Sequence, residues 1–297
     1  MLKGFVCPPH GEEPGRKNKI NYCLTKCTKK CAAPPLLAAM LEQEKQNPHA
    51  GNVISATMLT GGCKRQTYLR RTVDYYEEPD NKLPLFRGTL IHKLVEAGNT
   101  KQVQKAGFLL EHHMEMDIET QSGKWILSAT SDIIDTKEKV LYDVKTLQEY
   151  ALNLLIKGKE RGKWSTHIPD SYTLQANIYR YMAKKLGIVD IKRLRLQIIG
   201  FGSLIITGSS TTLREYKKRK GLVETTYDIP DVPILPDETV EYCIKVEGEE
   251  WYKILYSQTL YPSVCNDDWS WLCKKCVFKG TKHCPDPDKE RKGDWVF

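Results

Sequence analysis

The stretch from Trp125 to Thr146, WILSATSDIIDTKEKVLYDVKT, most constrains how this chain can fold. Two apolar runs flank a short charged segment, a pattern that predicts two β-strands joined by a turn. Side chains two positions apart on a strand point to the same face, so Asp143 and Lys145 share one face of the second strand. Asp132, on the first strand, can face this pair across the hairpin. The stretch therefore predicts a charged cluster on a β-sheet.

Such a cluster is energetically costly, because neighbouring carboxylates repel each other unless a cation neutralises them. Hard oxygen donors prefer Mg²⁺ or Mn²⁺. Two interpretations stay open from the hairpin alone. Asp132, Asp143 and Lys145 form a metal-dependent phosphodiesterase site, or they are ordinary charges at a strand edge.

Composition limits the class of protein. The 297 residues include 45 Lys+Arg and 37 Asp+Glu, a formal net charge of +8 that suits a polyanionic partner without requiring one. No apolar run approaches the roughly 18–20 residues of a membrane span. The N-terminus, MLKGFVCPPHGEE, lacks the apolar segment of a secretory signal. We therefore expect an intracellular protein with no membrane partner. The sequence carries no signal for its oligomeric state.

Ten cysteines then need an explanation, because a reducing cytosol disfavours disulfides and clustered intracellular cysteines commonly bind metals. Cys273 and Cys276 form a Cys-x-x-Cys pair, and Cys284 follows eight residues later. Zinc and iron–sulfur clusters both take four such thiolates. The fourth ligand is Cys265 nearby or Cys63 far up the chain, and the spacing alone does not choose between them.

The N-terminal cysteines form a separate group. Cys23, Cys27 and Cys31 recur every four residues and would share one face of a helix. Together with Cys7 or His10 they provide the ligands of a small zinc site. The alternative is a flexible arm whose thiols bind nothing.

Composition and periodicity divide the chain into four segments: a Cys-rich appendage (1–50), a helical segment (51–100), a core (101–236) and a C-terminal helix with cysteines (237–297). Helices are expected over 84–98, near 148–160, and over 171–187 and 237–257, and one or two strands over 192–207. In the first helix an apolar stripe is expected, with His92 beside it (Leu90, Ile91, Leu94 and Val95). In the third, Gln175 and Tyr179 share a face. Two basic groups either line a groove for a nucleic-acid strand or form a solvated surface (Lys64, Arg65, Arg70, Arg71; Lys217–Lys220).

The chain resembles the RecB-like branch of the PD-(D/E)XK nucleases in one ordered set of residues: His92, Asp132, Asp143-Val144-Lys145 and Gln175-x-x-x-Tyr179. One early cysteine and three late ones resemble its iron–sulfur subgroup, which contains the CRISPR-associated RecB-like exonucleases and the AddB-type nuclease domains. The resemblance covers roughly residues 55–285. It implies an α/β fold with a mixed central sheet flanked by helices, and a cysteine-ligated lobe built from both ends of the chain.

The resemblance also implies roles for single residues. His92, Asp132, Asp143 and the Val144 carbonyl would bind Mg²⁺ or Mn²⁺. Lys145 would act on the attacking water and the scissile phosphate, and Gln175 and Tyr179 would position the phosphate backbone or support the site. The implied ligands of a structural 4Fe–4S cluster are Cys63, Cys273, Cys276 and Cys284.

Three features depart from the family pattern. Ala129-Thr130-Ser131 replace a glycine that often precedes the first aspartate, which leaves Asp135 as a competing ligand on the opposite face. The gap between Cys276 and Cys284 is longer than the commoner spacing, so Cys265 remains a reserve ligand. The N-terminal cysteine segment lies outside the resemblance.

The sequence thus predicts a metal-dependent DNA exonuclease that acts on single strands or DNA ends. Two alternatives remain: a non-catalytic nucleic-acid-binding or assembly subunit of a CRISPR, recombination or viral DNA-processing complex, and a zinc-stabilised interaction protein. The sequence carries no signal for the polarity of cleavage, for the choice between DNA and RNA as substrate, or for the choice between endonuclease and exonuclease activity.

Overall fold

The computed structural model describes residues 2–7, 12–28, 37–42, 52–61, 63–148, 170–201, 226–229, 232–257, 276–279 and 281–284. Several predictions lie outside these residues. They are the helix near 148–160, the basic run Lys217–Lys220, and the side chains of His10, Cys31, Cys265 and Cys273.

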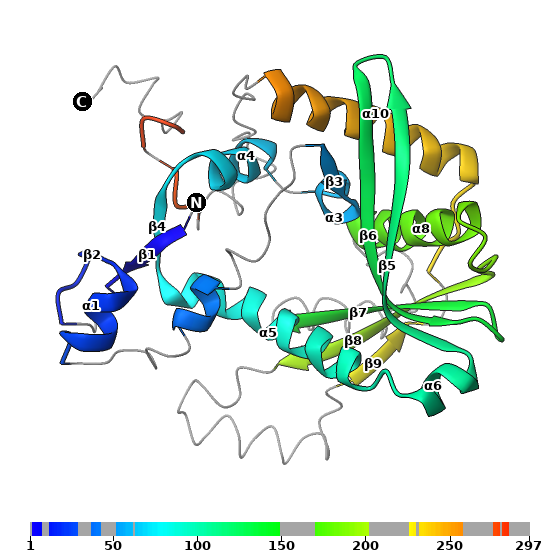
Figure 1. Ribbon diagram of the computed structural model, residues 1–297, viewed down its shortest axis with the longest axis horizontal. Coiled ribbons are helices and arrows are strands. Elements are labelled where there is room, and N and C mark those ends of the chain that lie inside the picture. The colour runs from blue at the N-terminus through cyan, green and yellow to red at the C-terminus, as the bar shows by residue number, and fades with distance from the viewer. Residues whose placement is uncertain are drawn as a thin grey trace, which may run out of the picture.

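Within the described residues, a mixed sheet of six strands forms the centre of the molecule, as predicted, with the path β3-β6-β7-β8-β9 and with β5 paired to β6 (Figure 1). The β3–β6 and β7–β8 pairs are parallel, whereas β5–β6, β6–β7 and β8–β9 are antiparallel. The strands are β3 (Val53–Ser55), β5 (Phe108–Thr120), β6 (Gly123–Asp135), β7 (Val140–Gln148), β8 (Arg193–Phe201) and β9 (Thr226–Ile229).

The predicted hairpin is present as β6 and β7, but its pairing is short. β7 pairs with β6 only over Ile133–Asp135, and β3 pairs with the same side of β6 only over Ile126–Ser128. Between these two segments β6 turns away from both neighbours, and β7 continues along β8 instead. The sheet therefore forks at residues 129–132 of β6, and Asp132 lies at this fork.

Two helices pack against the sheet beside the long β5–β6 hairpin, α8 (Asp170–Lys185) and α10 (Asp237–Ser257), and they confirm the helices expected over 171–187 and 237–257 (Figure 1). Helix α10 approaches β6 closely, because a Cβ atom on Gly248 would lie 2.0 Å from the Trp125 ring. The Trp251 indole is buried on the same helix and donates a hydrogen bond to the Met58 carbonyl. These contacts fix α3 (Ala56–Leu59) at the end of β3.

Helix α5 (Pro79–Ala97) carries His92 and packs on β5 and β7. The apolar stripe expected on it was wrong for two residues, since Leu90 is 48% exposed and Leu94 is 69% exposed. The reason is that α5 turns the opposite side, with the polar residues Thr89 and His92, toward the fork. Helix α6 (Lys101–Ala106) then leads into β5.

A second, smaller lobe joins distant parts of the chain. Its sheet has the order β2-β1-β4, formed by β1 (Leu2–Val6), β2 (Lys17–Asn18) and β4 (Tyr75–Glu77). Helix α1 (Ile20–Thr25) follows β2, and α4 (Lys64–Thr72) precedes β4. The small core combines Phe5, Leu69, Tyr75, Phe278 and Cys284. Residues from both ends of the chain therefore share one core.

The basic side chains of α4 contact the protein itself. Lys64 forms ion pairs with Glu247 and Glu250 of α10. Arg65 donates hydrogen bonds to the His283 carbonyl, and Arg70 forms an ion pair with the buried carboxylate of Glu77. Arg71 Nη2 donates a hydrogen bond to the sulfur of Met58 at 2.8 Å. These contacts tie α4 to α10 and to the C-terminal segment, and they give no support to the predicted strand-binding groove.

Candidate active site

A cleft of about 520 Å³ occupies the fork of the sheet. Each surrounding element contributes polar side chains to it. They are Ser55 (β3), Thr57 (α3), Thr89 and His92 (α5), Glu111 (β5), Ser128, Thr130 and Asp132 (β6), Asp143 and Lys145 (β7), and Gln175 and Tyr179 (α8). The cleft thus gathers the polar side chains of the predicted nuclease motif: His92, Asp132, Asp143, Lys145, Gln175 and Tyr179.

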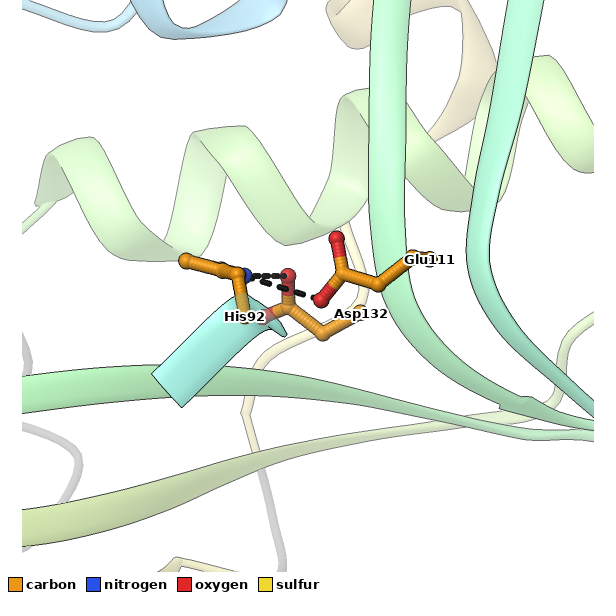
Figure 2. A group of neighbouring side chains, drawn as sticks. All are labelled: His92, Glu111 and Asp132. Carbon is orange, nitrogen blue, oxygen red and sulfur yellow. Dashed lines mark hydrogen bonds and ion pairs between the residues drawn. The ribbon is translucent and has the colours of Figure 1, made fainter. Parts of the chain in front are cut away.

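His92, Glu111 and Asp132 converge at one side of the cleft (Figure 2). His92 Nδ1 lies 3.0 Å from Glu111 Oε1 and 3.1 Å from Asp132 Oδ1. One potential ligand atom from each residue lies within 4.8 Å of the other two. Imidazole and carboxylate groups are suitable donors for a divalent cation, so this arrangement fits Mg²⁺ or Mn²⁺.

Glu111 was missed by the sequence analysis, which did not predict β5. The pairs Leu110–Ile133 and His112–Ser131 flank it, so Glu111 lies opposite Asp132 on the neighbouring strand. Its φ of 46° is unusual for a residue other than glycine. A signal was present in the sequence: Met114, Met116 and Ile118 alternate with charged residues, as in a strand.

Asp132 and Asp143 lie close together behind this group. Where β7 leaves β6, the Val144 N–H donates a hydrogen bond to Asp132 Oδ2, which fixes the carboxylate at the fork. Asp143 is only 1% exposed. Burial, followed by repulsion from Asp132, raises the pKa of Asp143 from 3.8 to about 6, against the opposing effect of Lys145.

One oxygen of Asp143 lacks a full set of partners. Lys145 Nζ lies 2.8 Å from both carboxylate oxygens but forms a well-directed hydrogen bond only with Oδ1. Among the described residues, the buried Oδ2 has no hydrogen-bond partner. A buried oxygen in this state is expected to bind water or a cation. This observation independently supports the fit of a divalent metal.

A chain of hydrogen bonds links Lys145 to α8. Lys145 Nζ donates to Gln175 Oε1 at 2.9 Å, and Gln175 Nε2 donates to the hydroxyl of Tyr179 and, at 3.3 Å, to that of Thr57. Burial raises the pKa of the Tyr179 phenol, so it stays protonated at neutral pH. Gln175 and Tyr179 therefore support Lys145 from the helix behind it.

The charge of His92 depends on the two carboxylates beside it. Hydrogen bonds with Asp132 and then Glu111 raise the pKa of His92 from 6.5 to about 10, and partial burial opposes them. In the protein without metal, His92 is therefore protonated at neutral pH. Its positive charge offsets the negative charges of Asp132 and Glu111, which a bound cation would otherwise offset.

The other candidate ligand on β6 has a structural role. Asp135 Oδ1 accepts hydrogen bonds from the backbone N–H groups of Lys137 and Glu138. Asp135 thus closes the turn between β6 and β7, and these bonds provide no reason to assign it to the metal group.

The described cysteines of the predicted cluster lie in the smaller lobe, whereas Cys243 lies on α10. Cys63 is the N-cap of α4, and its sulfur accepts a hydrogen bond from the Gln66 N–H. Burial raises the pKa of the Cys276 thiol against the opposing effect of the Phe278 and Lys279 backbone, and the Lys279 N–H donates a hydrogen bond to the Cys276 carbonyl. Cys276 packs against the small core in which Cys284 is buried, but among the described residues Cys63, Cys276 and Cys284 do not form a close group of three ligands.

The described N-terminal cysteines are Cys7 and Cys27, both buried, and the half-buried Cys23 on α1. Within the part of the chain that the structure describes, these thiols do not form a close group of three ligands. The predicted zinc site therefore stays a prediction.

Within the described ranges, the helices are too short or too polar to span a membrane. No protein-family model matches the chain, and no curated protein sequence matches it.

Three solved structures are similar to the chain. The structure of SSO0001 aligns with a TM-score of 0.44 and 14% identity over 82% of this chain and 92% of that one. A phage-related exonuclease from Haemophilus somnus 129PT aligns with a TM-score of 0.39 and 11% identity over 66% of this chain and 81% of that one. A protein described as an exonuclease from Eubacterium rectale aligns with a TM-score of 0.42 and 10% identity over 77% of this chain and 90% of that one.

Proposed function

We propose that this protein is a divalent-metal-dependent deoxyribonuclease that hydrolyses phosphodiester bonds, acting as an exonuclease on single-stranded DNA or DNA ends. One observation carries the proposal. The cleft combines the metal donors His92, Glu111 and Asp132 with the buried Asp143 and with Lys145, whose ammonium group lies 2.8 Å from Asp143.

Charge supports a single divalent cation at this site. Glu111, Asp132 and Asp143 carry three negative charges when ionised, and Lys145 carries one positive charge. With His92 neutral, two negative charges remain, which one divalent cation balances. A bound Mg²⁺ or Mn²⁺ would supply positive charge to the phosphate and lower the pKa of a water molecule.

The chain's own residues have distinct roles in this proposal. His92, Glu111, Asp132 and Asp143 hold the cation with the Val144 carbonyl. Lys145 orients the attacking water and stabilises the negative charge that develops on the phosphate. Gln175 holds Lys145 through its 2.9 Å hydrogen bond, and Tyr179 holds Gln175.

We also propose that Cys63, Cys273, Cys276 and Cys284 bind a structural 4Fe–4S cluster. The proposal rests on the resemblance, and the described residues Cys63, at the start of α4, and Cys276 and Cys284, at the small core, lie in the same lobe. Such a cluster would join α4 to the C-terminal segment, where Arg65 already donates to His283. Protein partners in a DNA-processing complex belong to the same proposal.

The test is degradation of end-labelled DNA by the purified protein in Mn²⁺, Mg²⁺ or EDTA. Single strands and duplexes labelled at either end are compared, with RNA as a further substrate. Lys145→Ala is expected to lower the rate about 10²–10³-fold. Lys93→Ala is the matched control, since Lys93 is an exposed lysine next to His92 that pairs with Glu96.

Metal-dependent cleavage that is lost in Lys145→Ala and kept in Lys93→Ala supports the proposal, and the product ladder gives the polarity. Equal cleavage by Lys145→Ala refutes the assigned site. Binding of DNA without cleavage by the wild type refutes the assigned activity.

A further inference from the structure

The ammonium group of Lys145 has a third neighbour besides Asp143 and Gln175. Lys145 Nζ lies over the ring of Tyr172, 5.3 Å from the ring centroid. This is within the roughly 6 Å over which an aromatic face attracts a cation. The Lys145 side chain is only 17% exposed, so water screens this attraction less than at an open surface.

Helix α8 delivers this ring together with the other groups that support Lys145. Tyr172, Gln175 and Tyr179 are spaced i, i+3 and i+7, so all three lie on one face of the helix. Gln175 donates to Tyr179 and accepts from Lys145, and Tyr172 adds an aromatic surface one turn earlier. A single helix face therefore supplies both polar and aromatic contacts to the same lysine.

We propose that Tyr172 is a positioning residue for Lys145, whose aromatic face holds the ammonium group beside Asp143 and Gln175 in the cleft. This inference rests on the proposed function for its catalytic consequence. A lysine side chain has a flexible four-carbon stem and three donors, and Asp143 and Gln175 accept from two of them. The ring covers one of the remaining directions, so the ammonium group stays at the cleft.

The attraction comes from the ring rather than from a phenolate. Burial raises the pKa of the Tyr172 phenol, so the side chain is neutral at the pH of an assay. Phenylalanine therefore preserves the interaction, whereas leucine removes the aromatic face and keeps an apolar side chain. This contrast separates positioning by the ring from a role of the hydroxyl.

The experiment compares Tyr172→Phe, Tyr172→Leu and wild type in two measurements. In the first, NMR of protein with ¹³C,¹⁵N-labelled lysine locates the ε-CH₂ signal of Lys145, assigned by its loss in Lys145→Arg. Protons above an aromatic face are shifted upfield. We expect an upfield signal in wild type and Tyr172→Phe and an ordinary one in Tyr172→Leu. An ordinary shift in the wild type overturns the proposal without reference to activity.

The second measurement is single-turnover cleavage of DNA at saturating Mn²⁺. Tyr172→Phe should stay within about twofold of wild type, and Tyr172→Leu should be slower by about 3- to 30-fold with unchanged Mn²⁺ affinity. The matched control is Lys185→Met, because Lys185 lies 5.3 Å from the Tyr181 ring on the same helix but outside the cleft.

Equal cleavage rates for Tyr172→Leu and wild type overturn the positioning role. The role is also overturned if the cleavage rate falls as far in Tyr172→Phe as in Tyr172→Leu. Absence of cleavage by the wild type contradicts the proposed function, and the NMR shift then decides the geometry by itself.

Discussion

Replacing Asp143 with asparagine should stabilise the protein without metal while it abolishes activity. Asp143 is 1% exposed, and its pKa rises from 3.8 to about 6, chiefly through burial. A carboxyl group with a raised pKa lowers stability above that pKa, because the unfolded chain ionises more easily. The cost at pH 8 is up to about 3 kcal/mol, at roughly 1.4 kcal/mol per pKa unit. Asparagine removes this cost.

The pH dependence separates this effect from changes in shape. As pH rises from 3.8 to about 6, the unfolded chain loses its proton first, and the folded protein loses stability throughout this window. Asp143→Asn should therefore have a higher free energy of unfolding than wild type, and this difference should be about 2 kcal/mol larger at pH 8 than at pH 4.5. Urea unfolding in EDTA, followed by circular dichroism, measures both values. Asp117→Asn is the control, an exposed carboxyl group on β5.

Manganese should reverse the order of the two proteins. Ligand that binds only the folded state stabilises it by about 4.1 kcal/mol at a concentration of 1,000 Kd, which exceeds the advantage of about 3 kcal/mol that Asp143→Asn has at pH 8. Wild type should gain this stability, and Asp143→Asn should gain little. The reasoning is refuted if Asp143→Asn is less stable than wild type in EDTA at pH 8, or if its advantage is the same at both pH values.

Three further predictions follow from the site and the smaller lobe. The affinity for Mn²⁺ should rise about tenfold per pH unit from pH 6.5 to 8.5, because His92, with a pKa of about 10, must lose its proton to bind metal; a flat dependence by electron paramagnetic resonance contradicts this. The same proton stabilises the metal-free fold below pH 6.5, and that contribution is lost as pH rises toward 10. Glu111→Gln should lower Mn²⁺ affinity at least tenfold while Glu115→Gln, an exposed change on the same strand, leaves it unchanged; equal calorimetric affinities remove Glu111 from the ligand set. Cys284→Ser should lower the iron content of anaerobically purified protein and leave its zinc unchanged; unchanged iron, or zinc in its place, refutes the cluster.

The sequence predicted the parts of the fold that depend on local patterns. The alternation along β7 puts Asp143 and Lys145 on one face, and the periodicity of 171–187 predicts α8 with Gln175 and Tyr179 together. Both are properties of a single element. They required no knowledge of which strands are neighbours.

The fork of the sheet was not predictable in the same way, because it depends on how β6 divides its pairing between β3 and β7. Glu111 was within reach of a register argument. The pair Thr120–Gly123 closes the β5–β6 hairpin, and counting back from it places Glu111 opposite Asp132. The roles of Lys64 and Arg65 were out of reach, since their partners lie on α10 and in the C-terminal segment.

The most direct test of the account follows Mn²⁺ binding and DNA cleavage in one titration. Bound Mn²⁺ is measured by electron paramagnetic resonance, and the initial rate is measured on end-labelled DNA in the same samples. The account predicts that occupancy and rate rise together in the wild type and that Asp132→Asn, which removes a carboxylate 3.1 Å from His92, loses both. Cleavage by wild type without bound Mn²⁺, or full cleavage by Asp132→Asn, would contradict the claim that this cleft is a metal-dependent nuclease site.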